Sequence, residues 1–161
     1  MEQKEMIDLL RQVASGTMDV EQAALKLKEE PFEDLGFAKI DHHRAMRQGV
    51  AEVIYGEGKT PEQIFRIAEA MKEKGQKAVL ITRMNKESAI YVGERLELQY
   101  DEVSQIGFIG EVPIKDGDGK IVVATGGTSD IPVAEEAART AETLGNEVVR
   151  LYDVGVAGVH R

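Results

Sequence analysis

Apolar residues in the first third of the chain predict two helices followed by two short strands. Between residues 6 and 13, and again between residues 20 and 27, they recur every three or four positions, which predicts two helices. Pro31 ends the second helix, because proline cannot donate the backbone hydrogen bond that a continuing helix needs. Two short apolar stretches, residues 37–40 and 50–55, then predict strands.

The middle of the chain opens with a signal for the start of a helix. Thr60 is a capping residue, Pro61 suits the first helical position and Gln63 can complete a capping box. The apolar positions that follow predict a helix that ends at Gly75. Downstream we expect a buried strand, a helix and a further strand, at residues 78–81, 87–92 and 96–100.

Residues 101–119 interrupt every periodicity and predict a domain boundary. Gly107, Gly110, Pro113 and the turn at 116–119 are all typical of loops. We therefore expect a small α/β N-terminal domain over residues 1–119 and the start of a second domain over residues 120–161.

The last forty residues have the clearest pattern. A β-branched strand at 121–124, a helix from about 132 to 144 and a strand at 147–152 predict one βαβ unit with parallel strands and a right-handed crossover. Two parallel strands cannot bury both faces of a sheet. Either they complete the sheet of the first region, or the chain is the front portion of a longer α/β domain, and we favour truncation.

Composition narrows the class of protein. The chain has 161 residues, no cysteine and a net charge of −9. The absence of cysteine excludes disulfides and thiolate chemistry within these residues, and the negative charge disfavours nucleic acid and anionic lipid as partners. No apolar run approaches the roughly 20 residues of a membrane span, and the first residues lack the layout of a signal peptide. We therefore expect a cytoplasmic α/β protein.

The main candidate binding residues lie in the loop between the strand at 121–124 and the helix that follows it. Gly127 lets the backbone approach a ligand, Thr128 and Ser129 offer hydroxyls, and the amides at the helix start attract anions. Asp130 would repel phosphate, so it suits a ribose hydroxyl or a proton transfer better. The alternative is an ordinary turn in which Ser129 or Asp130 caps the helix.

The segment that follows the last strand reaches the same edge of the sheet, where ligands bind in open α/β folds. His160 is the candidate general acid or base and Arg161 the candidate anion clamp. The alternative is a histidine–arginine pair on a frayed terminus.

Two further segments have weaker explanations. Residues 56–60 (Gly-Glu-Gly-Lys-Thr) look like the tail of a phosphate-binding P-loop, but Val53 stands where the first glycine is needed. Residues 41–43 (Asp-His-His) look like a metal-binding triplet of phosphoesterases, yet the further aspartates of that pattern are absent. We assign no metal ligands.

Taken in order, five segments resemble the LarB-type family, the pyridinium-3,5-biscarboxylic acid mononucleotide synthases. This family is related to the PurE-type phosphoribosylaminoimidazole carboxylases. The resemblance covers nearly the whole chain, and the last two segments are the most specific. The five are Asp41–Arg44, Gly56–Thr60, Thr82-Arg83, Gly127–Ala137 and Asp153–Arg161.

The resemblance implies a family-specific N-terminal domain followed by a PurE-like, flavodoxin-like parallel-sheet domain, assembled as a homo-oligomer that is octameric in the full-length family. It implies carboxylation of the pyridinium ring of nicotinic acid adenine dinucleotide by carbon dioxide or bicarbonate, with phosphoanhydride cleavage and release of AMP. The product is the precursor of the nickel-pincer nucleotide of lactate racemase. Mg²⁺ is the one cofactor we consider.

Residue by residue, Gly127, Thr128, Ser129 and Asp130 match the turn that holds the phosphoribosyl part of the substrate in the related carboxylases. His160-Arg161 looks like the segment that supplies their catalytic histidine and a phosphate-side arginine. Lys59, Arg44 and Arg83 are our candidates for adenylate or phosphate contacts. Their alternative role is ordinary exposed charge.

One departure from the family pattern bears on activity. Family members continue past the His-Arg segment into a portion with the cysteine thought to add to the pyridinium ring, and this chain has no cysteine. A thiolate adduct would make the ring electron-rich enough to attack carbon dioxide. We therefore expect partial substrate binding without turnover. The alternatives are a phosphoribosylaminoimidazole carboxylase or mutase of purine biosynthesis, and a non-catalytic nucleotide-binding or assembly module.

Overall fold

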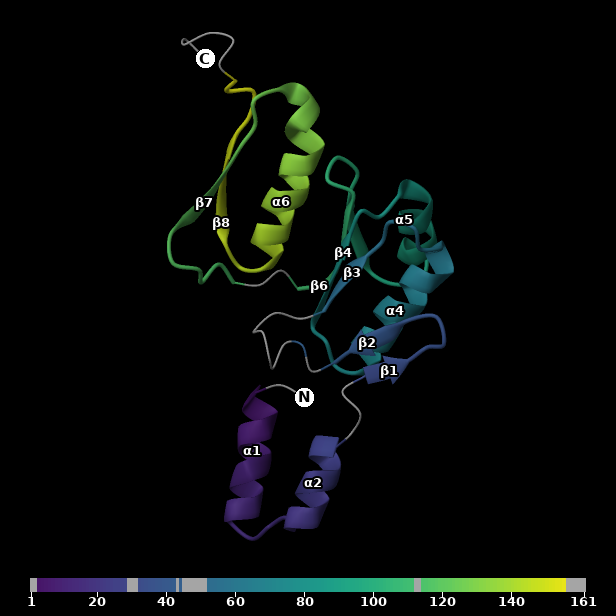
Figure 1. Cartoon of the computed structure of the whole chain (residues 1–161), viewed down its shortest axis with the longest axis vertical. Coiled ribbons are helices and arrows are strands. Elements are labelled where there is room, and N and C mark those ends of the chain that lie inside the picture. The colour runs from purple at the N-terminus through teal and green to yellow at the C-terminus, as the bar shows by residue number, and fades with distance from the viewer. Residues whose placement is uncertain (1–2, 29–31, 43, 45–51, 112–113, 156–161) are drawn as a thin grey trace. The chain divides into compact units, whose positions relative to one another are not determined.

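The computed structural model describes residues 3–28, 32–42, 44, 52–111 and 114–155 (Figure 1). The chain divides into two compact units, Met1–Glu52 and Val53–Arg161. Among the described residues, no helix is both long enough and apolar enough to cross a membrane.

The first unit holds two helices and a small hairpin. Helices α1 (Gln3–Ala14) and α2 (Val20–Lys28) confirm the two predicted helices and contact each other. Leu9 of α1 and Ala23 of α2 are buried. Strands β1 (Phe32–Asp34) and β2 (Lys39–Asp41) pair antiparallel. The prediction of a strand at 37–40 is therefore right only at its end, and β1 was missed.

The second unit begins with a four-stranded mixed sheet. Its strands are β3 (Val53–Tyr55), β4 (Ala78–Thr82), β5 (Leu98–Asp101) and β6 (Ile106–Gly110). They lie in the order β3-β4-β6-β5, with β3 and β4 parallel and the other neighbours antiparallel. The predicted strands at 50–55, 78–81 and 96–100 are thus confirmed in their described parts.

Helix α4 (Pro61–Glu73) starts where its sequence signal lies. The Gln63 amide N–H donates to Thr60 Oγ1 over 3.2 Å, and the Thr60 N–H donates to Gln63 Oε1 over 3.0 Å, which completes the predicted capping box. Ile64 and Met71 of this helix are fully buried. Helix α5 (Lys86–Gly93), likewise predicted, packs beside α4 (Figure 1).

Strand β6 corrects the interpretation of residues 101–119 as a boundary without regular structure. It is an inner strand of the sheet, and residues Ile106 to Ile109 are all buried. Gly107, read as a loop signal, allows close packing instead, because a Cβ there would lie 2.7 Å from Met84 Sδ and 3.0 Å from Leu98 Cδ1. The expected division into residues 1–119 and 120–161 stays a prediction.

The βαβ unit has the predicted form, which confirms the α/β class. Parallel strands β7 (Lys120–Ala124) and β8 (Glu147–Leu151) form a two-stranded sheet of their own, so they do not complete the first sheet within the described residues. A single turn η1 (Thr128–Asp130) leads into helix α6 (Ile131–Thr143), which contacts both strands and also β4 and β6. Its buried residues are Ala134 and Ala138.

Candidate functional site

The loops that follow β7 and β8 meet at the carboxyl edge of their sheet. Thr125 joins them, because its N–H donates to Leu151 O and its carbonyl accepts from the Val154 N–H, both over 3.0 Å. Its hydroxyl accepts from the Asp153 N–H, also over 3.0 Å. Thr125 is buried, so these contacts fix the two loops against each other.

Backbone forms the surface between these loops. A Cβ on Gly155 would collide with the carbonyl oxygen of Gly126, so only glycine allows the two loops to come this close. Asp153 has a φ of 58°, a left-handed conformation that residues other than glycine seldom adopt and that occurs often at binding sites. The geometry agrees with the prediction that both loops serve one edge.

The turn at Gly127–Asp130 presents hydroxyls to solvent. Asp130 Oδ2 accepts the Gly127 N–H over 3.1 Å, and Thr128, Ser129 and Asp130 are all exposed. Asp130 occupies the capping position of α6, but its side chain bonds back to Gly127 and makes no capping hydrogen bond to the helix. The alternative of an Asp130 cap is therefore not what the turn shows.

The structure does not describe all of the predicted site. His160 and Arg161 lie outside the described residues, which end at Gly155 in this region. Arg44 lies in the first unit, where its Nη1 is 3.4 Å from Glu52 Oε1. The structure therefore brings together Gly127–Asp130 and the residues that follow β8, and leaves the prediction for His160 and Arg161 as it stood.

A second carboxyl edge, that of parallel strands β3 and β4, carries Lys59 and Arg83. Lys59 Nζ donates to Tyr55 O over 2.7 Å. Arg83 has a φ of 50° and makes two ion pairs, from Nη1 to Glu57 Oε2 at 3.0 Å and from Nε to Glu136 Oε1 at 3.3 Å. In place of the P-loop suggested by residues 56–60, this edge holds an internally paired charge cluster.

Electrostatics reflect this pairing. A hydrogen bond from the Tyr55 hydroxyl and one from Arg83 hold the pKa of Glu57 below its usual value. The same contact with Glu57, followed by that with Glu136, raises the pKa of Arg83. The Arg83 guanidinium also lies 5.7 Å from the centre of the Tyr55 ring. Glu57 and Arg83 therefore both stay charged at neutral pH.

The Asp-His-His segment makes a different contact from the one a metal triplet would need. His42 Nε2 lies 2.9 Å from Glu33 Oε2, across the β1–β2 hairpin. His43 lies outside the described residues, and the part of the chain that the structure describes holds no group of three metal-ligating side chains.

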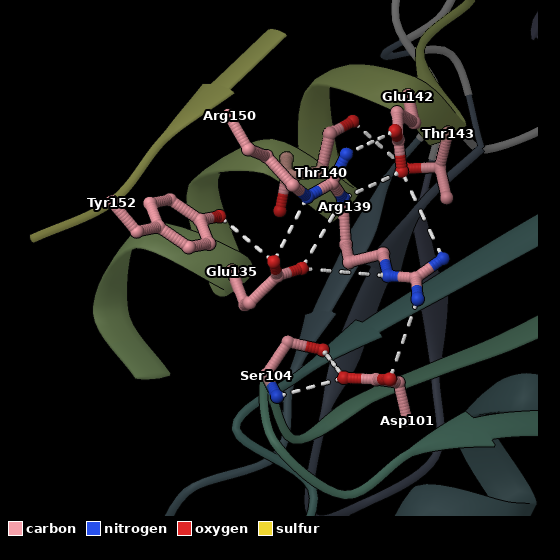
Figure 2. Close-up of polar contacts among 9 residues, drawn as sticks. All are labelled: Asp101, Ser104, Glu135, Arg139, Thr140, Glu142, Thr143, Arg150 and Tyr152. Atoms are coloured by element: carbon pink, nitrogen blue, oxygen red, sulfur yellow. Dashed lines mark hydrogen bonds and ion pairs between the residues drawn. The ribbon is translucent and has the colours of Figure 1, made fainter. Parts of the chain in front are cut away.

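Sequence reasoning missed a cluster of charged and polar residues that joins α6 to β8 (Figure 2). Arg150 forms bidentate contacts with two carboxylates, at 2.8 Å from Nε to Glu135 Oε1 and 2.6 Å from Nη1 to Glu142 Oε1. The Tyr152 hydroxyl donates to Glu135 over 2.8 Å, and Arg139 Nη2 reaches Asp101 Oδ2 at 3.4 Å. Glu135 and Glu142 are seven positions apart, two helical turns, which is the signal that could have revealed a shared partner.

This cluster shifts the titration of its members. The hydrogen bond from Arg150 outweighs burial and lowers the pKa of Glu142. For Glu135, burial opposes the shift, but the bonds from Arg150 and Tyr152 still lower the pKa. The two carboxylates in turn raise the pKa of Arg150.

Comparison with known proteins identifies the central part of the chain. Residues 32–111 match the protein-family model described as the LarB/PurE-like N-terminal domain. For this likeness we refer to residues 32–111 as the LarB/PurE-like domain. The match supports the relation to the LarB/PurE family that the sequence motifs imply.

A relative matches beyond the LarB/PurE-like domain. The uncharacterized protein MJ0165 of Methanocaldococcus jannaschii is 32% identical over 165 aligned residues, which include 98% of this chain. The chain spans 64% of the length of that relative.

The candidate residues divide between the LarB/PurE-like domain and the segment after it. Arg44, Lys59 and Arg83 lie within the matched residues, as does Glu57. The turn at Gly127–Asp130 and Glu136 lie beyond them. The ion pair between Arg83 and Glu136 therefore links the LarB/PurE-like domain to the βαβ unit.

Proposed function

We propose that this chain is part of a LarB-type enzyme that carboxylates the pyridinium ring of nicotinic acid adenine dinucleotide. Carbon dioxide or bicarbonate supplies the carboxyl group, a ring proton is lost, and hydrolysis of the phosphoanhydride releases AMP. The observation that carries the proposal is the LarB/PurE-like domain at residues 32–111, followed by a glycine-rich βα turn at a parallel-sheet edge.

The exposed turn would hold the ribose–phosphate part of the dinucleotide. The Thr128 and Ser129 hydroxyls can donate to phosphate oxygens, and glycine at position 127 lets the ligand approach the backbone. Asp130 is suited to a ribose hydroxyl, since its carboxylate already holds the turn through Gly127. We propose His160 for proton transfer and Arg161 for the phosphate.

Three basic residues are separate candidates for contacts with the adenylate or its phosphate. Lys59 and Arg83 share one edge of the LarB/PurE-like domain and both contact Tyr55. Arg44 is paired with Glu52 in the other unit. A phosphate would have to share each arginine with the carboxylate that already pairs with it.

Turnover requires groups that this chain does not contain. The proposed covalent step needs a thiolate, and the sequence has no cysteine. We propose that the complete enzyme supplies it from a further segment, as the resemblance implies, and that the enzyme works as a homo-oligomer.

Thermal denaturation in the presence of candidate ligands tests the proposal. The panel is nicotinic acid adenine dinucleotide, NAD, AMP and aminoimidazole ribotide, each added to the wild-type chain and to Ser129→Ala. A ligand at 100 times its Kd stabilises the folded state by about 2.7 kcal/mol. We expect nicotinic acid adenine dinucleotide to raise the Tm of the wild type and to raise that of Ser129→Ala less.

Ser15→Ala, at an exposed serine in the first unit, is the matched control and should keep the full shift. A shift with aminoimidazole ribotide alone would favour the purine-pathway carboxylase or mutase. No shift with any of the four ligands would contradict substrate binding by this chain.

A further inference from the structure

Arg83 connects three segments that are far apart in the sequence. It follows strand β4 directly, and its guanidinium contacts Glu57 in the loop after β3 and Glu136 in helix α6. The two partners are 26 and 53 positions away from it. All three segments belong to the motifs on which the family resemblance rests. We therefore ask what the contacts of Arg83 with the other two segments do.

The backbone around Arg83 is held in place from the side of the LarB/PurE-like domain. The Gly56 N–H donates to Thr82 O over 2.7 Å, which ties the loop after β3 to the end of β4. Arg83 itself has a left-handed backbone, which costs free energy and persists only where its surroundings enforce it. The backbone from which the Arg83 side chain extends is thus held in place.

On the other side, Arg83 contacts the helix that carries the candidate ligand loop. Glu136 lies on α6, and α6 follows the turn η1 without a break, so the helix and the Gly127–Asp130 turn move together. The Glu136 side chain is 23% exposed, which makes this the more sheltered of the two ion pairs. A second contact, from Arg139 to Asp101 at 3.4 Å, holds the same helix near the end of β5.

We infer that Arg83 is a positioning residue, which bridges Glu57 and Glu136 and thereby fixes helix α6 and the Gly127–Asp130 turn against the β3–β4 edge. As far as it concerns ligand affinity, this inference rests on the proposed function. Its structural part, the order of the turn in the ligand-free chain, does not.

The direct contact with phosphate, for which Arg83 was a candidate above, is the alternative to this positioning role, and it makes the opposite prediction for Glu136. If a phosphate competed with Glu136 for the guanidinium, Glu136→Gln would free the cation and tighten binding. If Arg83 acts by bridging, Glu136→Gln breaks the bridge and weakens binding, as Arg83→Gln does. The sign of one substitution therefore separates the two roles.

The experiment combines amide hydrogen exchange with a binding titration on the full chain. In the absence of ligand, Arg83→Gln and Glu136→Gln should speed exchange in the peptide covering residues 126–138 by about three- to tenfold, the range expected for losing one or two partly exposed ion pairs. Arg83→Lys, which keeps the charge but lacks the fork, should give an intermediate rate.

Arg95→Gln is the matched control, because Arg95, two residues beyond the end of α5, also pairs with a glutamate and lies over a tyrosine ring. It should leave exchange at 126–138 unchanged. In titrations with nicotinic acid adenine dinucleotide, both Arg83→Gln and Glu136→Gln should raise the Kd by about fivefold.

Two results would overturn the inference: unchanged exchange at residues 126–138 in both Arg83→Gln and Glu136→Gln, or tighter binding by Glu136→Gln than by the wild type. If the wild type does not bind the dinucleotide, the proposed function fails, while the exchange rates still decide whether Arg83 positions α6. Circular dichroism of each variant verifies that the chain remains folded.

Discussion

Gly56 shows how one missing side chain sets the geometry of the candidate site. A Cβ at this position would lie 2.9 Å from Thr82 O and 3.2 Å from Arg83 O. Both atoms belong to backbone, which cannot move aside as a flexible side chain could. The close approach brings Glu57, the next residue, within reach of the Arg83 guanidinium.

We expect Gly56→Ala to lower the free energy of unfolding by about 1–3 kcal/mol, because the added methyl group forces apart the two strand ends. Urea denaturation followed by circular dichroism measures this change. Gly93→Ala is the matched control, since nothing lies within 4 Å of a Cβ at that helical position. It should be neutral or slightly stabilising, and an equal loss in both variants would contradict the explanation.

At the scale of the secondary structure elements, sequence patterns located the helices and strands that carry a chemical signal of their own. Thr60 and Pro61 marked the start of α4, and β-branched residues marked β7 and β8. The patterns failed at β1, which has three residues, and at β6, whose glycine fits a buried packing arrangement. Periodicity cannot distinguish a glycine that breaks a strand from one that makes room beside it.

The cap of α4 allows a direct measurement of one such signal. Thr60→Ala removes the hydroxyl that accepts the Gln63 N–H and should cost about 1 kcal/mol of stability. Thr60→Ser keeps the acceptor oxygen and should stay close to the wild type. Both values come from urea denaturation, and equal stability of the two variants would show that the cap contributes nothing.

The Arg150 cluster joins α6 to β8 and should matter more than an exposed ion pair. Arg150→Met leaves Glu135 and Glu142 with their longer contacts to Arg139, at 3.7 and 3.8 Å, in place of the short ones to Arg150. We therefore expect a loss of about 1–3 kcal/mol, between the values for exposed and buried pairs. Arg11→Met removes an exposed pair with Asp8 and should change stability by no more than about 0.5 kcal/mol. A loss of stability in Arg150→Met that is no greater than that in Arg11→Met would contradict a stabilising role of the Arg150 cluster.

At the scale of the whole molecule, paired carboxylates set the response to acid. Hydrogen bonds from Ser104 lower the pKa of Asp101, and those from Arg150 lower the pKa of Glu142. A carboxyl group whose pKa is lower in the folded state stabilises that state above its unfolded pKa. This contribution is lost as the pH falls through the folded-state pKa.

We therefore expect the free energy of unfolding to be level from about pH 7 to pH 5. It should decrease once the pH drops below the ordinary carboxyl pKa values, 4.5 for glutamate and 3.8 for aspartate. Urea denaturation across pH 7 to pH 3 measures the profile. Arg150→Met should show a shallower decline, because Glu142 then titrates nearer its unfolded value. A steeper decline in the variant would contradict this assignment.

The candidate site could be predicted in part, for a reason of distance along the chain. The turn at Gly127–Asp130 is a local feature, so strand and helix patterns on either side were sufficient to place it. The partners of Arg83 lie 26 and 53 positions away, and no local pattern brings them together. Tertiary packing determines which exposed charges meet.

The inner position of β6 has a consequence for how the protein is made. Strand β4 pairs with β3 on one side and with β6 on the other, while β5, made earlier than β6, reaches the sheet only through it. On the ribosome, β4 therefore keeps one edge open until residue 110 has left the exit tunnel. During that interval the edge needs protection from other nascent chains, and slow translation after residue 82 would prolong the exposure.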